Sequence, residues 1–213
     1  MANQHYLICV CFVLVFSYAS CVQTVNGRIK ITVGTTSACL DTINFFRDQL
    51  VPTYNLYGDF LDLEIVPWGR TVRHDNGTLT CQFGENDCWA NRLHRCALNS
   101  LRGNQKAQLD YMACELAPPY PAYRHASFAC VQAAGINIIQ ADFCVNNPGS
   151  DTLDEDARNA SIEPMAVINF VPSIVFNDNP DRNIHLQAFR RLSSVVCFAL
   201  ADDPTTGVTG CQI

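Results

Sequence analysis

Two segments near the start of the chain alternate polar and apolar residues, and an amphipathic segment lies between them. Residues 28–34 and residues 61–67 alternate in this way and are rich in β-branched side chains, which predicts two strands. Residues 40–50 carry apolar side chains at spacings of three and four, which predicts a helix that ends before Pro52. The pattern therefore predicts a β-α-β unit with Cys39 at the turn where the helix begins.

The middle of the chain has a different pattern. Apolar residues recur at helical spacing over residues 81–145 and are interrupted by prolines, which predicts several short helices. An acidic loop is expected at residues 151–156, and a connecting segment or short strand at residues 164–170. Residues 173–176 predict a short buried strand, and residues 186–200 predict a final amphipathic helix.

This order of elements indicates an α/β protein with a thioredoxin-like fold and a cysteine-rich helical insertion at about residues 84–145. We expect one such domain over residues 22–213. The composition agrees with a folded protein, because hydrophobic residues make up 48% and charged residues only 16% of the chain. A net charge of −6 argues against nucleic acid as a partner.

The N-terminus predicts a secretory signal peptide over residues 1–21. Residues 6–18 are almost continuously apolar, which is too short to span a bilayer, and small residues follow them. Cleavage after Ala19 and retention as an uncleaved anchor are the alternatives. After cleavage we expect no membrane contact and a location in the secretory pathway, either secreted or lysosomal.

An oxidising compartment makes disulfides the expected state of the cysteines. Residues 22–213 contain nine cysteines, so that four disulfides leave one thiol over. Cys39 is the candidate, because it lies 42 residues from its nearest neighbour. The other eight are expected to form disulfides whose pairing the sequence leaves open: Cys81, Cys88, Cys96, Cys114, Cys130, Cys144, Cys197 and Cys211. The spacings in 81–96 do not match a zinc site, and no metal is expected. Sequons at Asn76 and Asn159 predict N-linked glycosylation.

Cys39 carries the candidate chemistry. A thiol at a helix N-terminus faces unpaired backbone N–H groups and the positive end of the helix dipole, which favour the nucleophilic thiolate. The redox motif C-x-x-C requires a second cysteine at position 42, where this chain has Thr42. A hydroxyl cannot resolve a mixed disulfide. We expect Thr42 to donate a hydrogen bond to the Cys39 thiolate, and release to depend on an external thiol.

The stretch from Cys81 to Cys96 carries a specific resemblance. Its cysteines, with Gln82, Gly84 and Asn91, match the pattern C-Q-H-G-x2-E-C-x2-N-x4-C, although Phe83 and Asp87 replace the pattern's His and Glu. This signature resembles that of the gamma-interferon-inducible lysosomal thiol reductase (GILT) family. Residues 66–69 (VPWG) and 170–172 (FVP) also resemble family segments, so that the resemblance covers about residues 28–211.

The resemblance implies a thioredoxin-like fold and disulfide reduction in a lysosomal or secreted setting. It assigns Cys39 the role of attacking thiol and makes this chain a variant with Thr42 at the position of the resolving cysteine. It also implies a cis peptide bond at Pro172, with Val171 offering its backbone to an extended substrate. An ordinary trans proline opening an edge strand is the alternative for Pro172.

Three functional hypotheses follow. The first is a thiol–disulfide oxidoreductase that uses Cys39 alone, has disulfide-bonded proteins as substrates, needs no bound cofactor, and takes glutathione or cysteine as external reductant. The second is a catalytically inactive protein of this fold that binds clients or traps them as mixed disulfides. The third is a cysteine protease that pairs Cys39 with one of the histidines, which the surrounding sequence supports least.

Overall fold

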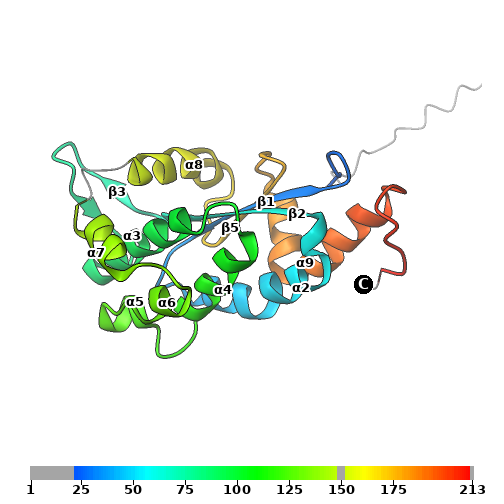
Figure 1. Cartoon of the computed structure of the whole chain (residues 1–213). Helices are drawn as coiled ribbons and strands as arrows, with labels where there is room; N and C mark the ends of the chain where they lie inside the picture. Colours follow the sequence, from blue (N-terminus) through cyan, green and yellow to red (C-terminus); the bar gives the residue numbers. More distant parts are fainter. Residues whose placement is uncertain (1–21, 148–151, 212–213) are drawn as a thin grey trace, which may run out of the picture.

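The computed structural model of the chain describes residues 22–147 and 152–211. At its centre lies a three-stranded sheet of order β2-β1-β5 (Figure 1). Strand β1 (Ile29–Thr35) pairs in parallel with β2 (Leu61–Pro67) and antiparallel with β5 (Ser173–Phe176). Parallel β1 and β2 require a crossover, and the predicted helix supplies it. The sequence prediction of an α/β, thioredoxin-like architecture is confirmed.

The crossover helix is longer than the sequence predicts. It begins as α1 (Leu40–Phe45), passes through a π-helical turn, η1 (Phe46–Leu50), and continues as α2 (Val51–Tyr57) and a 3-10 turn, η2 (Gly58–Phe60). The prediction that the helix ends before Pro52 is therefore wrong. Pro52 lies in the first turn of α2, where a missing N–H is tolerated.

Helices cover both faces of the sheet. The last helix, α9 (Arg182–Ala201), contacts β5, η1 and α2, and Phe189 stacks on Phe45 with ring centroids 6.1 Å apart. Asp181 caps α9, so that this helix starts four residues before the predicted position. Helix α8 (Leu153–Val167) lies on the other side of the sheet, against β2 and β5 (Figure 1).

Two predictions for the region of α8 are wrong. Residues 153–156 are not a loop but the first turn of this helix, while residue 151 lies outside the described part of the chain. Acidic side chains are favourable at a helix N-terminus, and Asp154 also forms ion pairs with Arg92 and Arg95. Residues 164–167 are likewise helical, because α8 continues through Pro164 while packing on the sheet. Tertiary packing outweighs the helix-breaking tendency of this proline.

The insertion between β2 and β5 begins with a short hairpin of β3 (Val72–Arg73) and β4 (Leu79–Thr80). Five helices follow before α8: α3 (Glu85–Ser100), α4 (Gln105–Glu115), α5 (Pro121–His125), α6 (Ala129–Ala133) and α7 (Ile138–Asn146). Three disulfides tie this region together, and a fourth holds the C-terminal segment to α9: Cys81–Cys88, Cys96–Cys144, Cys114–Cys130 and Cys197–Cys211.

Titratable side chains are buried together in the insertion. Nε2 of His94 in α3 lies 3.9 Å from Oε2 of Glu115 in α4, which also accepts a hydrogen bond from the N–H of Ala122 at 3.0 Å. The His94 ring packs edge-on against Tyr111. Burial raises the pKa of Glu115 to about 7. Burial, with the charge of Arg95, lowers the pKa of His94 to about 3.

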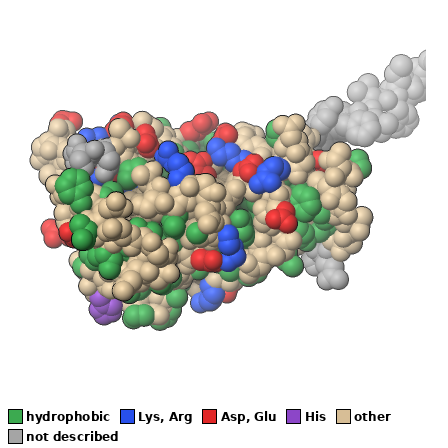
Figure 2. All heavy atoms as spheres, viewed as in Figure 1, with side chains coloured by type: hydrophobic (Ala, Val, Ile, Leu, Met, Phe, Trp, Pro, Cys, Tyr) green, Lys and Arg blue, Asp and Glu red, His purple; other side chains and the backbone are tan. Residues whose placement is uncertain are grey.

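The surface is polar with scattered apolar residues. Figure 2 shows basic and acidic side chains interleaved on one face, with apolar side chains gathered near α7, where Ile139 and Phe143 are exposed. Within residues 22–147 and 152–211, no helix has the length and apolar content needed to cross a membrane. Asn76 and Asn159 are both exposed, and their glycosylation stays a prediction. The predicted signal peptide, residues 1–21, lies outside the described residues.

The disulfides should contribute unequally to stability. The Cys96–Cys144 bond joins residues 48 apart, whereas Cys81–Cys88 joins residues 7 apart. Since a longer closed loop restricts the unfolded chain more, replacing Cys96 and Cys144 by Ala should lower the free energy of unfolding by about 4 kcal/mol. The Cys81/Cys88 double replacement should cost about 2 kcal/mol. Urea unfolding measures both, and equal losses would contradict this ranking.

Stability should also respond to pH through Glu115. The pKa of Glu115 is about 7 in the folded state and 4.5 in the unfolded state, so this residue contributes to the free energy of unfolding. The contribution is complete below pH 4.5 and is lost as the pH rises through 7. His94 acts oppositely, because its lowered pKa costs stability as pH falls below 6.5. Comparison with Glu115→Gln isolates the first effect. From pH 7.5 to 5, wild type should gain about 2 kcal/mol relative to this variant. If urea unfolding gave the same pH dependence of stability for wild type and Glu115→Gln, the raised pKa of Glu115 would be refuted.

Candidate active site

The site is built on the residue at the start of α1. Cys39 is the N-cap of this helix, and its carbonyl accepts the first helical hydrogen bond from the N–H of Ile43 at 3.0 Å. Its side chain is a free thiol, and it is the one free cysteine among the described residues. Cys39 itself is buried, with 7% of its surface accessible, while the next residue, Leu40, is 65% exposed. The thiol therefore lies just below the surface at the C-terminal end of β1.

The cis-proline loop faces this thiol. The peptide bond between Val171 and Pro172 is cis, and the Cys39 thiol donates a hydrogen bond to the carbonyl oxygen of Val171 at 3.4 Å. The loop can approach β1 closely because position 34 is glycine. A Cβ on Gly34 would lie 2.3 Å from the hydroxyl oxygen of Ser173, the residue after the proline. Cys39, Val171 and Pro172, predicted from distant parts of the sequence, thus lie at one place.

Thr42 lies one helical turn beyond Cys39 and has no accessible surface. Its hydroxyl has no hydrogen-bond partner among the described residues, and the hydrogen bond of Cys39 goes to Val171. The expected hydrogen bond from Thr42 to Cys39 is therefore not formed. A cysteine at position 42 would place its sulfur next to that of Cys39, since residues three apart lie on the same face of a helix.

The segment just before Cys39 is held by two side chains of α3. The buried carboxylate of Asp87 accepts hydrogen bonds from the hydroxyl of Thr36 at 2.8 Å and the N–H of Ser37 at 3.1 Å. It also accepts from the Ser37 hydroxyl and from the N–H of Phe83. Asn91 accepts from the N–H of Ser37 at 2.9 Å and donates to the Thr36 hydroxyl at 2.9 Å. The cysteine-rich signature therefore positions the segment that leads into Cys39.

The loop after β2 supports the same segment from another side. A Cβ on Gly69, which has a φ of +57°, would lie 2.9 Å from the Cβ of Thr36. Trp68 is buried, and the guanidinium of Arg95 lies 5.3 Å from its ring centroid. The VPWG segment thus brings its backbone against Thr36 where a larger residue would not fit.

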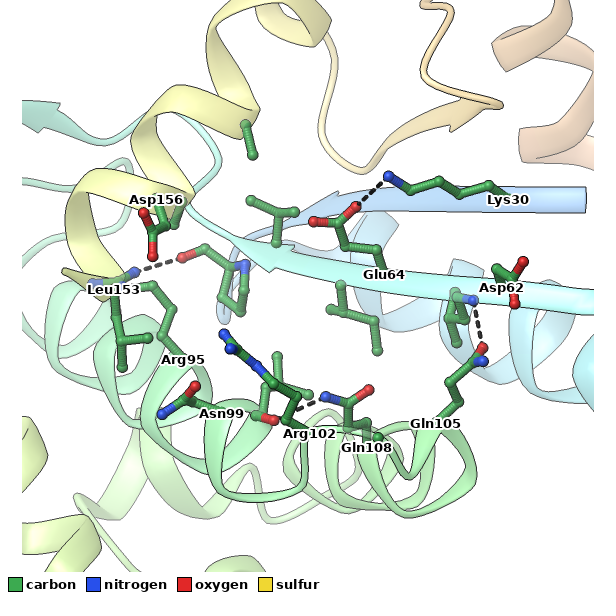
Figure 3. Close-up of a pocket in the computed structure, with 18 residues that line it drawn as sticks. Lys30, Asp62, Glu64, Arg95, Asn99, Arg102, Gln105, Gln108, Leu153 and Asp156 are labelled. Carbon is green, nitrogen blue, oxygen red and sulfur yellow. Dashed lines mark hydrogen bonds and ion pairs between the residues drawn. The ribbon is translucent and has the colours of Figure 1, made fainter. Parts of the chain in front are cut away.

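A pocket of about 360 Å³ along the outer edge of β2 is separate from the thiol (Figure 3). Its rim mixes charges, including the Lys30–Glu64 ion pair and Arg102, and Cys39 is not among its lining residues. In the part of the chain that the structure describes, no three His, Cys, Asp or Glu side chains are grouped so as to hold a metal.

Sequence reasoning missed several residues of the site. Thr36 and Ser37 belong to no recognisable sequence motif, and Asp87 and Asn91 enter only as positions of the signature. His185 is one of the histidines that the protease hypothesis offers as a base for Cys39, and the structure buries it against Phe170, with ring centroids 5.6 Å apart. Burial lowers the pKa of His185 to about 4, and nearby Arg182 adds to the effect. The one available signal was the spacing of the signature, which does not reveal what its polar residues contact.

Comparison with known proteins decides the family. The sequence profile of the gamma interferon inducible lysosomal thiol reductase (GILT) family matches residues 30–134, which include Cys39 and the whole signature. The chain belongs to the GILT family. Thr42 stands where a C-x-x-C motif that begins at Cys39 would have its second cysteine.

Relatives of this GILT protein extend the similarity over most of its length. It is 23% identical to GILT-like protein 1 of Drosophila melanogaster, covering 91% of this chain and 83% of that protein. It is 24% identical to a gamma-interferon-inducible lysosomal thiol reductase-like protein of Anopheles gambiae, covering 84% and 80%. A solved structure of an oxidised DsbA1 mutant superposes with a TM-score of 0.44 at 9% identity, over 86% of this chain and 90% of that one.

Removing the charge of Asp87 should disturb the site. Asp87→Asn keeps the shape but turns an NH2 group toward donors that now bond to a carboxylate. We expect a loss of about 3 kcal/mol in the free energy of unfolding, since buried donors lose a charged acceptor. We also expect at least a severalfold change in the rate at which iodoacetamide alkylates Cys39 under native conditions. The control is Asp110→Asn at an exposed ion pair with Lys106. Equal behaviour of the two variants would contradict the positioning role.

Proposed function

We propose that this GILT protein is a thiol–disulfide oxidoreductase that reduces protein disulfides through the single thiol of Cys39. One observation carries the proposal: a free thiol at the N-terminus of α1 lies 3.4 Å from the carbonyl oxygen of Val171, beside a cis proline. This arrangement is present in a chain that has Thr42 where a C-x-x-C motif would have its second cysteine. Membership in a family named for thiol reductase activity supports the same chemistry.

The first step is attack on a substrate disulfide. The Cys39 thiolate bonds to one substrate sulfur, the disulfide breaks, and the other sulfur leaves as a thiolate that takes up a proton. The backbone of Val171 offers a hydrogen-bonding edge to an extended substrate segment, which orients its disulfide toward Cys39.

The second step requires a thiol from outside the protein. Thr42 cannot attack the mixed disulfide, because an aliphatic hydroxyl does not ionise at acidic or neutral pH and cannot form a disulfide. Glutathione or cysteine is the proposed reductant, and no bound cofactor is needed. The proposed substrates are disulfide-bonded proteins of the secretory pathway, in a lysosomal or extracellular location that the family name and the apolar N-terminal segment support.

A second candidate function rests on the environment of Thr42. The residue is fully buried, so no solvent thiol replaces the missing cysteine from that side of Cys39. If external thiols reach the mixed disulfide slowly, the protein traps disulfide-bonded clients instead of releasing them. The two candidates differ only in the rate of the second step.

Three proteins distinguish these functions in a multiple-turnover assay near pH 5 with glutathione or cysteine. Wild type should reduce a protein disulfide repeatedly, and Cys39→Ser should lose at least 100-fold in rate, because no other free thiol is present among the described residues. Thr42→Cys should release substrate without waiting for an external thiol, and its rate should depend less on thiol concentration.

Two outcomes would contradict the proposal. If Cys39→Ser retains wild-type activity, Cys39 is not the nucleophile. If wild type stops after one turnover while Thr42→Cys continues, the protein is a trap, and mass spectrometry should then find the client attached to Cys39.

A further inference from the structure

A second pocket, of about 460 Å³, lies between the loop after β2 and helix α8. Its lining includes Trp68 and Gly69 from the VPWG segment, Ile162 and Met165 from α8, and Asn169 from the segment before the cis proline. Figure 1 shows α8 and β3 at the same end of the molecule, where β2 ends. The pocket therefore lies at the carboxyl ends of the parallel strands β1 and β2, the end of the strands at which open α/β sheets bind their ligands.

Three guanidinium groups line this pocket: Arg70, Arg73 and Arg158. No carboxylate is among its lining residues. Glu155 binds Arg73 at 2.7 Å and Arg158 at 2.8 Å, so that one carboxylate faces two of the three cations. A local excess of positive charge on a chain of net charge −6 selects for an anionic ligand.

The pocket is joined to the active site through Arg70. Its guanidinium donates to the side-chain oxygen and to the carbonyl of Asn169, each at 2.7 Å. Asn169 has a positive φ of 53° and lies two residues before Val171, whose carbonyl binds the Cys39 thiol. Two residues span at most about 7.6 Å between Cα atoms. On the other wall, Gly69 lies against Thr36, three residues before Cys39.

We propose that this pocket is a subsite for a small thiol that carries carboxylates, such as glutathione, and that it delivers the external reductant to Cys39. The inference rests on the proposed single-thiol function, because only a site without a resolving cysteine needs such delivery. An arginine guanidinium binds a carboxylate through two parallel hydrogen bonds. The apolar side chains of Ile162 and Met165 accommodate the remainder of the ligand.

The delivered thiol takes part in two balanced exchanges. Its thiolate attacks the Cys39 sulfur of the mixed disulfide, the bond to the substrate breaks, and the substrate leaves as a thiolate that takes up a proton. The delivered molecule is now joined to Cys39 by a disulfide. A second thiolate attacks the sulfur of that molecule, the bond to Cys39 breaks, the external disulfide leaves, and Cys39 returns as a thiolate. Two thiols are thus oxidised for each substrate disulfide that is reduced.

Binding is measured first without chemistry. S-methylglutathione keeps both carboxylates but cannot exchange, and calorimetry on the Cys39→Ser protein reports its affinity. We expect binding that weakens about fivefold in each of the Arg70→Gln and Arg158→Gln backgrounds and weakens with added salt. The hydrogen bonds to Asn169 come from Arg70, whereas Arg158 is paired with Glu155 within α8, so its variant separates charge from loop geometry. Arg102→Gln, an exposed arginine in the pocket of Figure 3, is the matched control.

Kinetics form the second arm. Wild type, Arg158→Gln and Arg102→Gln are loaded with a Cys39 mixed disulfide, and its reduction is followed with glutathione and with uncharged 2-mercaptoethanol. Arg158→Gln should slow glutathione about fivefold and leave 2-mercaptoethanol unchanged. Equal effects on both thiols, or equal binding in the Arg158→Gln and Arg102→Gln proteins, would overturn the subsite while leaving Cys39 as nucleophile. Undiminished reduction by Cys39→Ser would instead overturn the proposed function. The calorimetric measurement would still show whether the pocket binds S-methylglutathione.

Discussion

The buried carboxylate of Asp87 is the interaction on which the site depends. It gathers donors from Thr36, Ser37 and Phe83, three residues that belong to two separate parts of the chain. A buried charge is stable only when it is fully hydrogen-bonded, so the segment before Cys39 and the first turn of α3 cannot move independently. The helical insertion is thereby part of the active site's framework.

The disulfides reinforce the same framework. Cys88 directly follows Asp87, and its bond to Cys81 closes the loop that contains Phe83. Cys96, farther along α3, is bonded to α7, while Arg92 and Arg95 on the same helix bind Asp154 of α8. Helix α3 is thus fixed along its length, and its first two turns hold Asp87 and Asn91 against the segment before Cys39.

The site has one free thiol, because Thr42 stands where a C-x-x-C motif would have its second cysteine. Thr42 fills the buried position below Cys39, and the cis-proline loop still meets the thiol. In the proposed single-thiol mechanism, reduction continues only if an external thiol reaches the mixed disulfide. We propose the arginine-lined pocket beside Asn169 as the place where that thiol binds, because the pocket combines positive charge, apolar contacts and proximity to the loop.

The sequence by itself determined the β-α-β unit, the α/β class, the odd cysteine at position 39 and the GILT resemblance, since these depend on local periodicity, counting and a spaced motif. It failed where long-range packing overrides local preference, as in the helix through Pro52 and in α8 through Pro164. Only the tertiary structure decided that Asp87 and Asn91 hold the segment before Cys39, and that Arg70 joins a pocket to the cis-proline loop. Those contacts join residues 50 to 99 positions apart, and no local pattern encodes which of many polar side chains will meet when the chain folds.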